Sequence, residues 1–500
     1  MKKFDVLIIG SGMGGLVCGN ILAKEGYSVC IVEKNKQIGG CLQIYVRDRV
    51  IFDSGVHYIG GLEKGQTLYQ IFKYLGLMEK LSLEKMDPGF DRVLIEGDSK
   101  EYRIMQGYEA FEKELVSDFP DEKAAIRLYI DSIRETCDAF PLYRLRNTGD
   151  PERKEKAMSL SAKIFIDSVT NNKTLRSVLA GNNMLYAGSG ESTPFYVHAL
   201  TVNSYIESAW RCLNGGAQIA KHIARNITAC GGLVLKNKEV KKLIVEDNRI
   251  TAALLQDGTF ISADHFVSNI TPAATFKMVD SVLVRPVTRK RIEAMPHTIS
   301  SFIVNIVLKR KSFPYVKHNF YYQKDSVWAM DNYSEDNWPL GYGMFLTPDE
   351  SGEFADGMTI FAYMRYEEVL PWAATYNTVA DKKSRGLGYE SFKERKMERL
   401  LAVVEQRFPD LRESILHSYT STPLTFRDYI GNGDGNLYGS AKDYKNPLGT
   451  LVSAKTRIPN LFLTGQYLNL HGILGTAISG LISCIQLTGK DDFIEKIKNA

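Results

Sequence analysis

The sequence lacks the features that mark secreted, metal-binding or membrane-spanning proteins. Its seven cysteines (18, 30, 41, 137, 212, 230 and 484) are scattered, odd in number and never spaced as C-x-x-C. We interpret them as reduced thiols and assign no metal site. No apolar run approaches the roughly 18–20 residues of a membrane span. The first apolar run, Val6–Ile9, is too short for a signal-peptide core. These observations predict a cytoplasmic protein.

A strong charge of one sign is also missing. The 62 Lys and Arg residues are nearly balanced by 58 Asp and Glu residues, which gives a net charge of +4. No segment combines a basic cluster with interleaved aromatic residues, so we expect no nucleic-acid partner. Hydrophobic residues make up 44% of the 500 residues, enough for more than one core. This length predicts two or three domains, or one large domain with insertions.

The start of the chain contains a dinucleotide-binding pattern. The run Val6–Ile9 leads into Gly10-x-Gly12-x-x-Gly15 and a helical pattern, and a second apolar run ends at Glu33. Gly10 permits a tight turn, Gly12 permits close approach to a pyrophosphate, and Gly15 permits close packing of helix on sheet. Amide groups at the helix N-terminus attract the phosphates. Glu33 accepts hydrogen bonds from a ribose 2′-OH and repels a 2′-phosphate, so the pattern predicts FAD or NAD rather than NADP.

Two further segments favour FAD over NAD. Gly39-Gly40 comes soon after Glu33, the acid predicted to bind the ribose. A backbone that passes beside a flavin's ribityl chain and pyrophosphate needs residues without Cβ. Near the C-terminus, an apolar strand at 461–463 leads into Gly465-Gln466 and then into an apolar helical pattern from Gly472. The positive end of that helix is suited to lie beside a flavin ring and to stabilise its anionic reduced form.

The remaining patterns predict an α/β fold with a discontinuous cofactor domain. We assign residues 1–65, 205–285 and 450–500 to the FAD-binding domain, and the insertions 66–204 and 286–449 to a substrate-binding domain. The first insertion is expected to be mainly helical, with a charged surface loop at 146–157. The second is expected to be α+β with a mixed sheet. Its predicted strands are 302–310, 319–323, 342–346 and 358–364, followed by a helix at 390–407.

Several motifs spread along the whole chain carry a family resemblance. They are GSGMGG with Glu33, Gly39-Gly40, FDSGVHYIGG (52–61), LNGGAQIAKHI (213–223), the Gly231-Gly232 strand unit that leads to Val240, and TGQYLNLHGILGTAISG (464–480). With these motifs the chain resembles the phytoene desaturase, carotenoid isomerase and retinol saturase branch of the FAD-dependent oxidoreductases. The resemblance implies a Rossmann-type, glutathione-reductase-like FAD-binding domain. It also places the Val240 backbone against adenine and Gln466 near the ribityl chain.

These motifs together define the residues that we expect to contact FAD. They are Gly10, Gly12, Met13, Gly14, Gly15, Glu33, Lys34, Gly39, Gly40, Val240, Gly465, Gln466 and Leu474.

Two histidines are the candidates for proton transfer. In this chemistry the flavin exchanges a hydride with a substrate carbon, and protein groups handle one proton. His57 follows the flavin-contacting segment, and imidazole titrates near neutrality. A packed histidine bonded to backbone is an equally consistent interpretation of His57. His471 precedes the C-terminal helix, where it either faces the flavin ring or only caps the helix. The weaker candidates are Tyr58, Tyr467 and Asn469.

The insertions indicate the kind of substrate. They carry apolar and aromatic faces but no Arg or Lys cluster suited to a phosphate or carboxylate, so we expect a lipophilic polyene such as a carotenoid or retinoid. Its C=C bonds would be saturated, desaturated or isomerised, with NAD(P) as a candidate electron donor or acceptor. Such a substrate implies transient, peripheral contact with the inner face of the membrane. Aromatic residues that either line a tunnel or form plain core are Tyr186, Phe195, Tyr196 and Trp210.

Other functional classes remain open from sequence alone. A flavin amine oxidase or a protoporphyrinogen-oxidase-like enzyme shares the same cofactor motifs. A non-enzymatic flavin-binding module is disfavoured by the two well-patterned insertions.

Overall fold

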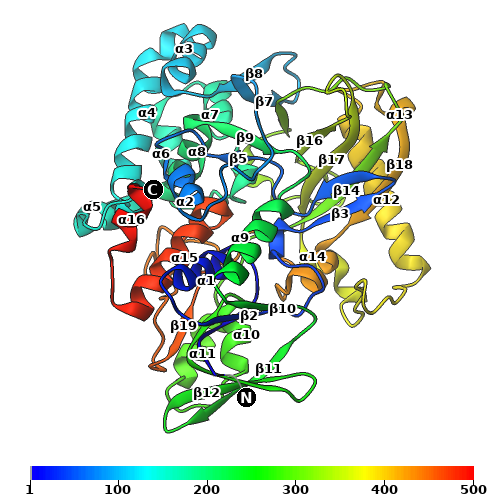
Figure 1. The fold of residues 1–500 in the computed structure, drawn as a ribbon. Helices are drawn as coiled ribbons and strands as arrows, with labels where there is room; N and C mark the ends of the chain where they lie inside the picture. The colour runs from blue at the N-terminus through cyan, green and yellow to red at the C-terminus, as the bar shows by residue number, and fades with distance from the viewer. Residues whose placement is uncertain (1–2) are drawn as a thin grey trace.

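A computed structural model describes residues 3–500, and its first seven-stranded sheet is built on the N-terminal strand. The strand order is β10-β2-β1-β13-β12-β11, with β19 paired beside β13. Strands β10, β2, β1 and β13 pair in parallel, in that order, and β19 also pairs in parallel with β13. Strands β13, β12 and β11 form an antiparallel meander. The strands are β1 (Phe4–Ile9), β2 (Val29–Val32), β10 (Leu233–Leu235), β11 (Val240–Glu246), β12 (Arg249–Leu255), β13 (Phe260–Ser268) and β19 (Leu461–Leu463). The start, middle and end of the chain therefore meet in one sheet (Figure 1).

Helix α1 (Met13–Lys24) packs between α9 (Ala217–Ala229) and α15 (Gly472–Thr488) beside this sheet (Figure 1). Small residues permit this close packing. A Cβ atom at Gly19 would lie 2.9 Å from Ile31 Cδ1, and one at Gly480 would lie 2.8 Å from the Gly14 carbonyl oxygen. Any larger side chain would push α1 away from the sheet or from α15.

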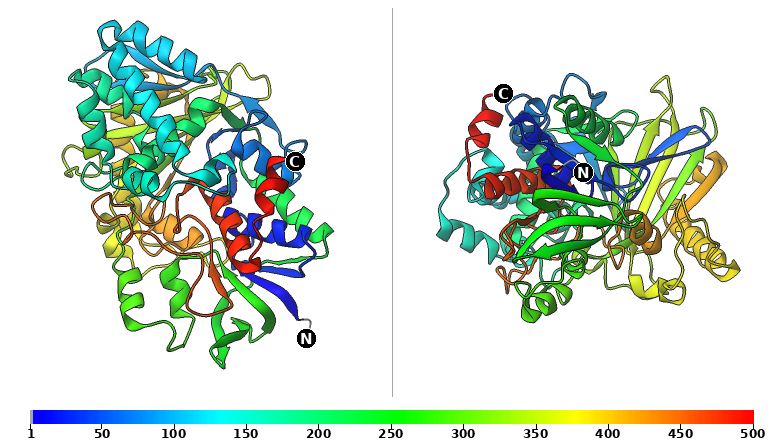
Figure 2. Two further views of the ribbon diagram at one scale, coloured as in Figure 1. Left: turned by 90° about the vertical axis from the view of Figure 1, so that its left-hand side faces the viewer. Right: turned by 60° about the horizontal axis from the view of Figure 1, so that its bottom comes forward.

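A second seven-stranded sheet, in the order β18-β14-β17-β16-β15-β7-β8, lies beside the first and is covered by α12 (Leu387–Val404). Figure 2 shows it to one side of the molecule, in yellow-green. Its strands are β7 (Gly89–Ile95), β8 (Glu101–Met105), β14 (Ser300–Leu308), β15 (Asn319–Gln323), β16 (Gly341–Pro348), β17 (Ala355–Met364) and β18 (Ile415–Ser421). Two small sheets are β3 (Ile44–Arg47) with β4 (Val50–Asp53), and β5 (Ile59–Gly60), β9 (Ala209–Cys212) and β6 (Leu83–Lys85).

The first insertion forms a helical region at the upper left of Figure 1. Its helices are α2 (Thr67–Tyr74), α3 (Tyr108–Asp118), α4 (Lys123–Asp138), α5 (Pro151–Met158), α6 (Ala162–Val169), α7 (Lys173–Leu179) and α8 (Phe195–Glu207). The remaining helices are α10 (Pro272–Lys277), α11 (Pro286–Glu293), α13 (Leu411–Ser414), α14 (Pro423–Ile430) and α16 (Phe493–Lys498).

The first insertion is mainly helical, as expected, but two local features differ from the sequence pattern. Strands β6, β7 and β8 interrupt it, and β7 pairs in parallel with β15, more than 200 residues away. Because β7 is buried on both faces, it shows no alternation that distinguishes a strand from a helix. The charged run 146–157 is not all loop, since α5 begins at Pro151. The Asp150 side chain caps it by accepting hydrogen bonds from the Glu152 and Arg153 amides.

The α/β fold class is confirmed. The predicted strands of the second insertion correspond to β14, β15, β16 and β17, and its predicted helix corresponds to α12. Within residues 3–500, no helix is both long enough and apolar enough to cross a membrane.

Candidate functional site

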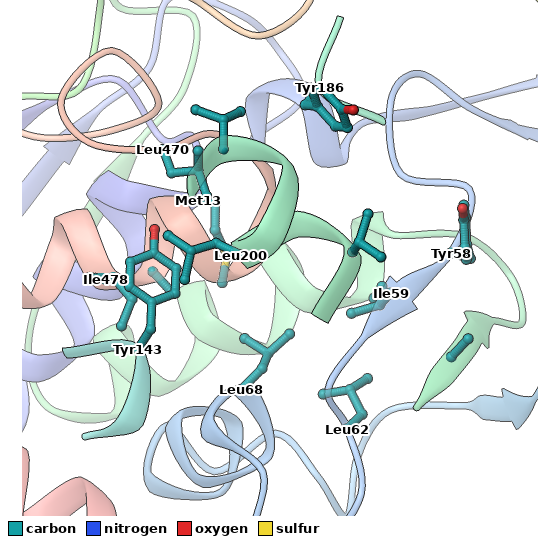
Figure 3. Packing of buried hydrophobic residues seen from close by; sticks show 14 of the residues in the cluster. Met13, Tyr58, Ile59, Leu62, Leu68, Tyr143, Tyr186, Leu200, Leu470 and Ile478 are labelled. Carbon is teal, nitrogen blue, oxygen red and sulfur yellow. The ribbon is translucent and has the colours of Figure 1, made fainter. Parts of the chain in front are cut away.

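A cavity of about 510 Å³ opens where β1, β2, β13 and β19 end, beside the second sheet. This is the edge at which open parallel sheets bind ligands. Most of the predicted cofactor residues line it: Gly10, Gly12, Met13, Gly14, Glu33, Lys34, Gly39, Gly40, Val240, Gly465 and Gln466. Gly15 and Leu474 do not. Met13 also extends into the core beside Leu200 and Leu470 (Figure 3).

The two glycine motifs touch each other. Gly10 has φ of +90°, which the turn after β1 requires and which favours glycine. The Gly39 amide donates to the Ser11 carbonyl at 3.1 Å and to Ser11 Oγ at 3.2 Å. A Cβ atom at Gly40 would lie 3.3 Å from the Gly12 Cα. The two backbones therefore form one side-chain-free cradle along the cavity wall.

Gly15 acts behind this cradle rather than in it. A Cβ atom there would lie 2.5 Å from the Gly10 carbonyl oxygen, which is backbone that cannot move aside. Gly15 therefore keeps α1 close to the first turn, as the sequence pattern predicts.

Glu33 is buried at the tip of β2 and holds the first turn in place. Its Oε2 accepts hydrogen bonds from the Ser11 amide at 3.0 Å and from Ser11 Oγ at 2.7 Å. Its Oε1 accepts one from the Asn35 amide at 2.9 Å. A carboxylate has about four acceptor positions. One position on Oε1 therefore remains for a ribose hydroxyl in the cavity.

Glu33→Ala is expected to weaken flavin retention by about 1–2 kcal/mol, because a ribose hydroxyl loses its charged acceptor. This corresponds to a dissociation constant about 5- to 30-fold higher, measured by titrating the apoprotein with FAD. Glu33→Gln, which keeps one acceptor oxygen, should lose less. Equal affinity in the wild type and both variants would show that Glu33 does not contact the ribose.

Asn269, just after β13, is a site residue that the sequence analysis missed. A Cβ atom at Gly12 would lie 2.7 Å from its Nδ2, and Cβ atoms at Gly14 and Gly465 would each lie 2.8 Å from its Oδ1. The amide thus occupies the space left by three glycines. It makes no side-chain hydrogen bond within residues 3–500 and lines the cavity. The sequence offers one signal, a polar residue directly after an apolar strand.

The C-terminal segment completes the cofactor side of the cavity. Gly465 has φ of +97° and follows β19, and the N-terminal turn of α15 contributes Gly472, Ile473 and Thr476 to the wall. The positive end of the α15 dipole therefore faces the cavity. Leu474 lies in the same turn but does not line the cavity.

The rest of the wall comes from the second insertion and carries no charged side chain among the described residues. It consists of Ser301, Ile303, Phe361, Phe426, Tyr429, Ile430, Gly431, Asn432, Leu437 and Tyr438. The Ser301 hydroxyl is buried and has no hydrogen-bond partner among residues 3–500. The charged lining residues, by contrast, all come from the segments assigned to the cofactor domain: Glu33, Lys34, Lys238, Glu239, Lys241 and Lys277.

His57 lines the cavity and stacks on Phe345, with ring centroids 4.3 Å apart and planes 9° from parallel. Burial, with a smaller contribution from the charge of Arg211, lowers the pKa of His57 to about 4. Its ring makes no hydrogen bond to the described residues 3–500, so it is not the backbone-bonded histidine of the alternative interpretation. At neutral pH it is an uncharged imidazole able to accept a proton.

His471 has neither of its expected roles. Its side chain makes no capping bond to α15, and its ring does not line the cofactor cavity. Nε2 lies 3.0 Å from the Leu185 carbonyl oxygen, and the ring packs on Tyr438. It faces a separate pocket of about 230 Å³ that shares only Tyr438 and Gln466 with the cofactor cavity. Burial lowers the pKa of His471 to about 4.

The three weaker candidates for proton transfer lie in different places. Tyr467 lines the cavity, whereas Asn469 does not, and the Tyr58 hydroxyl donates to the buried Asp91 at 2.8 Å. The aromatic residues considered for a tunnel stay outside the cofactor cavity: Tyr186, Phe195, Tyr196 and Trp210. Of these, Tyr186 lines the smaller pocket.

Comparison with known proteins agrees with this geometry. Residues 8–75 match the NAD(P)-binding Rossmann-like domain. The chain is 27% identical to the all-trans-retinol 13,14-reductase of Danio rerio, over 97% of this chain and 85% of the relative. It is 24% identical to prolycopene isomerase 1 of an Oncidium hybrid cultivar, over 99% of this chain and 85% of the relative. The chain is therefore similar, over nearly its whole length, to enzymes that act on retinol and on prolycopene.

Fold comparison extends beyond these relatives. Wild-type putrescine oxidase superimposes with a TM-score of 0.64 at 13% identity, covering 98% of this chain and all of that one. The shared architecture is a flavin-type dinucleotide-binding fold. The residues present fit such a ligand, because the glycine cradle, the free acceptor position of Glu33 and the unpaired amide of Asn269 all face one cavity.

Proposed function

We propose that this protein is an FAD-dependent oxidoreductase that saturates, desaturates or isomerises C=C bonds of a lipophilic polyene, such as a carotenoid or retinoid. The observation that carries the proposal is the asymmetry of the cavity. The part of the wall from the segments assigned to the cofactor domain is a charged dinucleotide cradle. The part from the second insertion is apolar and aromatic, with no charged side chain among the described residues. An apolar wall with few polar groups suits a long hydrocarbon chain.

Bound FAD would supply hydride exchange with a substrate carbon, with NAD(P) as the proposed electron donor or acceptor. The protein excludes water through the apolar wall and offers one group for the accompanying proton. For desaturation, we assign that role to the neutral imidazole of His57, which would accept the proton that leaves the substrate. Its depressed pKa makes it an acceptor rather than a donor at neutral pH.

The relatives' names support a polyene over an amine. The matched relatives are a retinol reductase and a prolycopene isomerase, both named for polyenes. Putrescine is a cation, and the substrate wall described here offers no carboxylate to pair with an ammonium group. We therefore rank an amine or porphyrinogen oxidase second. A non-enzymatic flavin-binding module ranks below both. We also propose a cytoplasmic location with peripheral membrane contact.

The test is product analysis. The flavin-loaded protein, oxidised and reduced, is incubated with retinol or a carotenoid, and the products are identified by mass and chromatography. A gain of two hydrogen atoms indicates saturation, a loss of two indicates desaturation, and a retention shift at constant mass indicates isomerisation. If the polyenes remain unchanged and the protein oxidises amines or porphyrinogens, the oxidase function would replace this proposal.

A further inference from the structure

The surface around α11 exposes aliphatic side chains to solvent. Val282 is 86% exposed, Val287 is 69% exposed and Leu448 is 74% exposed. Two exposed cations, Arg285 and Lys290, lie among them in the sequence. We call these five residues the α11 face. Single exposed aliphatic side chains are ordinary on a protein surface, but Val287 and Leu448 belong to separate segments that are held together.

Separate segments form this face. The Arg291 Nη1 atom donates to the Gly449 carbonyl at 3.1 Å and the Leu451 carbonyl at 3.3 Å, which fastens the 448–451 loop to α11. Val287 lies one helical turn before Arg291, on the same side of the helix. Leu448 is therefore held next to the Val287 side of α11. In the left view of Figure 2, α10 and α11 (green) project at the lower edge of the molecule.

The charge of this region is positive and unneutralised. Arg285 and Lys290 form no ion pair with any carboxylate of residues 3–500, since the described salt bridges lie elsewhere. Residues 277–293 contain five basic residues and two acidic residues, Asp280 and Glu293. The α11 face thus combines projecting aliphatic groups with free cations.

We infer that the α11 face docks on the surface of an anionic lipid bilayer. Aliphatic side chains that project between cations enter the headgroup–acyl boundary, while Lys and Arg pair with lipid phosphates. An acidic protein surface would match the cations but would leave the three aliphatic side chains facing polar groups. Docking needs no membrane-spanning helix, because the contact lies in the plane of the interface.

The location links the α11 face to the interior. The chain runs from α11 directly into Pro296 and His297, which line the pocket of about 230 Å³, and Lys442 lines it shortly before the Leu448 loop. That pocket shares Tyr438 and Gln466 with the cofactor cavity. The segments that carry the α11 face therefore continue into the wall of a pocket that adjoins the cofactor cavity. The consequence for substrate delivery rests on the proposed function, whereas the docking itself does not.

Vesicle sedimentation of the flavin-loaded protein tests the inference. We expect binding to vesicles of phosphatidylcholine with phosphatidylglycerol and at least tenfold weaker binding to phosphatidylcholine alone. The triple variant Val282→Ser, Val287→Ser and Leu448→Ser should bind anionic vesicles at least tenfold more weakly. The variant Arg285→Glu with Lys290→Glu should lose the preference for anionic vesicles. Arg291 is left intact because it holds the loop.

The matched control replaces aliphatic residues exposed elsewhere. Leu128 on α4 is 54% exposed and Ile164 on α6 is 57% exposed. Leu128→Ser with Ile164→Ser should bind vesicles like the wild type. Three results would overturn the inference. The wild-type protein does not bind anionic vesicles, both α11 variants bind them as the wild type does, or the control variant loses as much binding as the α11 variants. A dimer that the triple variant dissociates without any change in vesicle binding would instead make this face a contact between copies.

Substrate delivery gives a second readout. The triple variant should turn over a polyene in detergent at the wild-type rate, yet turn over the same polyene in anionic vesicles several-fold more slowly. Equal vesicle rates in the triple variant and the wild type, despite turnover in detergent, would overturn the link to delivery. Absence of turnover in detergent by the wild type contradicts the proposed function instead, and vesicle binding then still decides the docking inference.

Discussion

Gly12→Val is expected to give a folded but colourless protein. Gly12 has φ of −65° and ψ of 172°, a conformation that any residue adopts, so the substitution introduces no backbone strain. Its Cβ atom would approach only the end of the Asn269 side chain, which can rotate away. The rest of the valine projects into the cradle where a pyrophosphate must approach the backbone. We expect flavin content to fall to about a tenth or less of wild type.

Visible absorbance of the purified protein measures this loss, and circular dichroism verifies the fold. Gly388→Val is a matched control, because Gly388 has ordinary φ and a Cβ atom there meets no neighbour within 4 Å. The control should remain as yellow as the wild type. Full flavin content in Gly12→Val would show that the first glycine turn does not contact the cofactor.

His57→Ala is expected to slow turnover by about 10²-fold or more while leaving flavin content unchanged. The imidazole lines the cavity without a hydrogen-bond partner among the described residues, so its loss removes the proton acceptor and little structural support. His471→Ala is the matched control. That ring lies behind Tyr438 in the neighbouring pocket, and its removal should leave the rate within about twofold of the wild type.

The pH profile separates a chemical role from a packing role for His57. Because the pKa of His57 is lowered to about 4, the imidazole is neutral at pH 7 and stays largely neutral down to about pH 5. Wild-type kcat should therefore be flat from neutrality to about pH 5 and fall as the pH approaches 4. His57→Ala should lack this acid limb. A fall centred near pH 6.5, or an acid limb that survives in the variant, would assign the proton to another group.

Local sequence predicts one half of the site well. Gly10, Gly12 and Glu33 act through a turn and two adjacent strands, so their spacing alone specifies their positions. Asn269 reaches the same turn only because β13 pairs with β1, a contact between residues about 260 positions apart. Ser301 and Phe361 depend likewise on how the second sheet faces the first. No local pattern encodes such distances.

The direction of each side chain is a second feature that the sequence does not predict. Sequence places His57 and His471 equally close to cofactor motifs, yet one ring faces the cavity and the other turns toward the Leu185 carbonyl. The difference arises from packing against Phe345 and Tyr438, which belong to the second insertion. Strand β7 is unpredictable for a related reason, since burial on both faces removes its alternation.

Anaerobic rapid mixing tests whether the bound flavin acts on C=C bonds. Reduced, flavin-loaded protein is mixed with retinol or a carotenoid, and oxidised protein is mixed with a partly saturated form of the same polyene. We expect the flavin absorbance and the polyene absorbance to change together. In the desaturation direction, where a proton leaves the substrate, the change should be about 10²-fold slower in His57→Ala than in the wild type and His471→Ala. Isomerisation would shift the polyene spectrum while the flavin returns to its reduced form. Polyenes that leave both spectra unchanged, alongside reduction of the oxidised protein by amines or porphyrinogens, would contradict the proposed function.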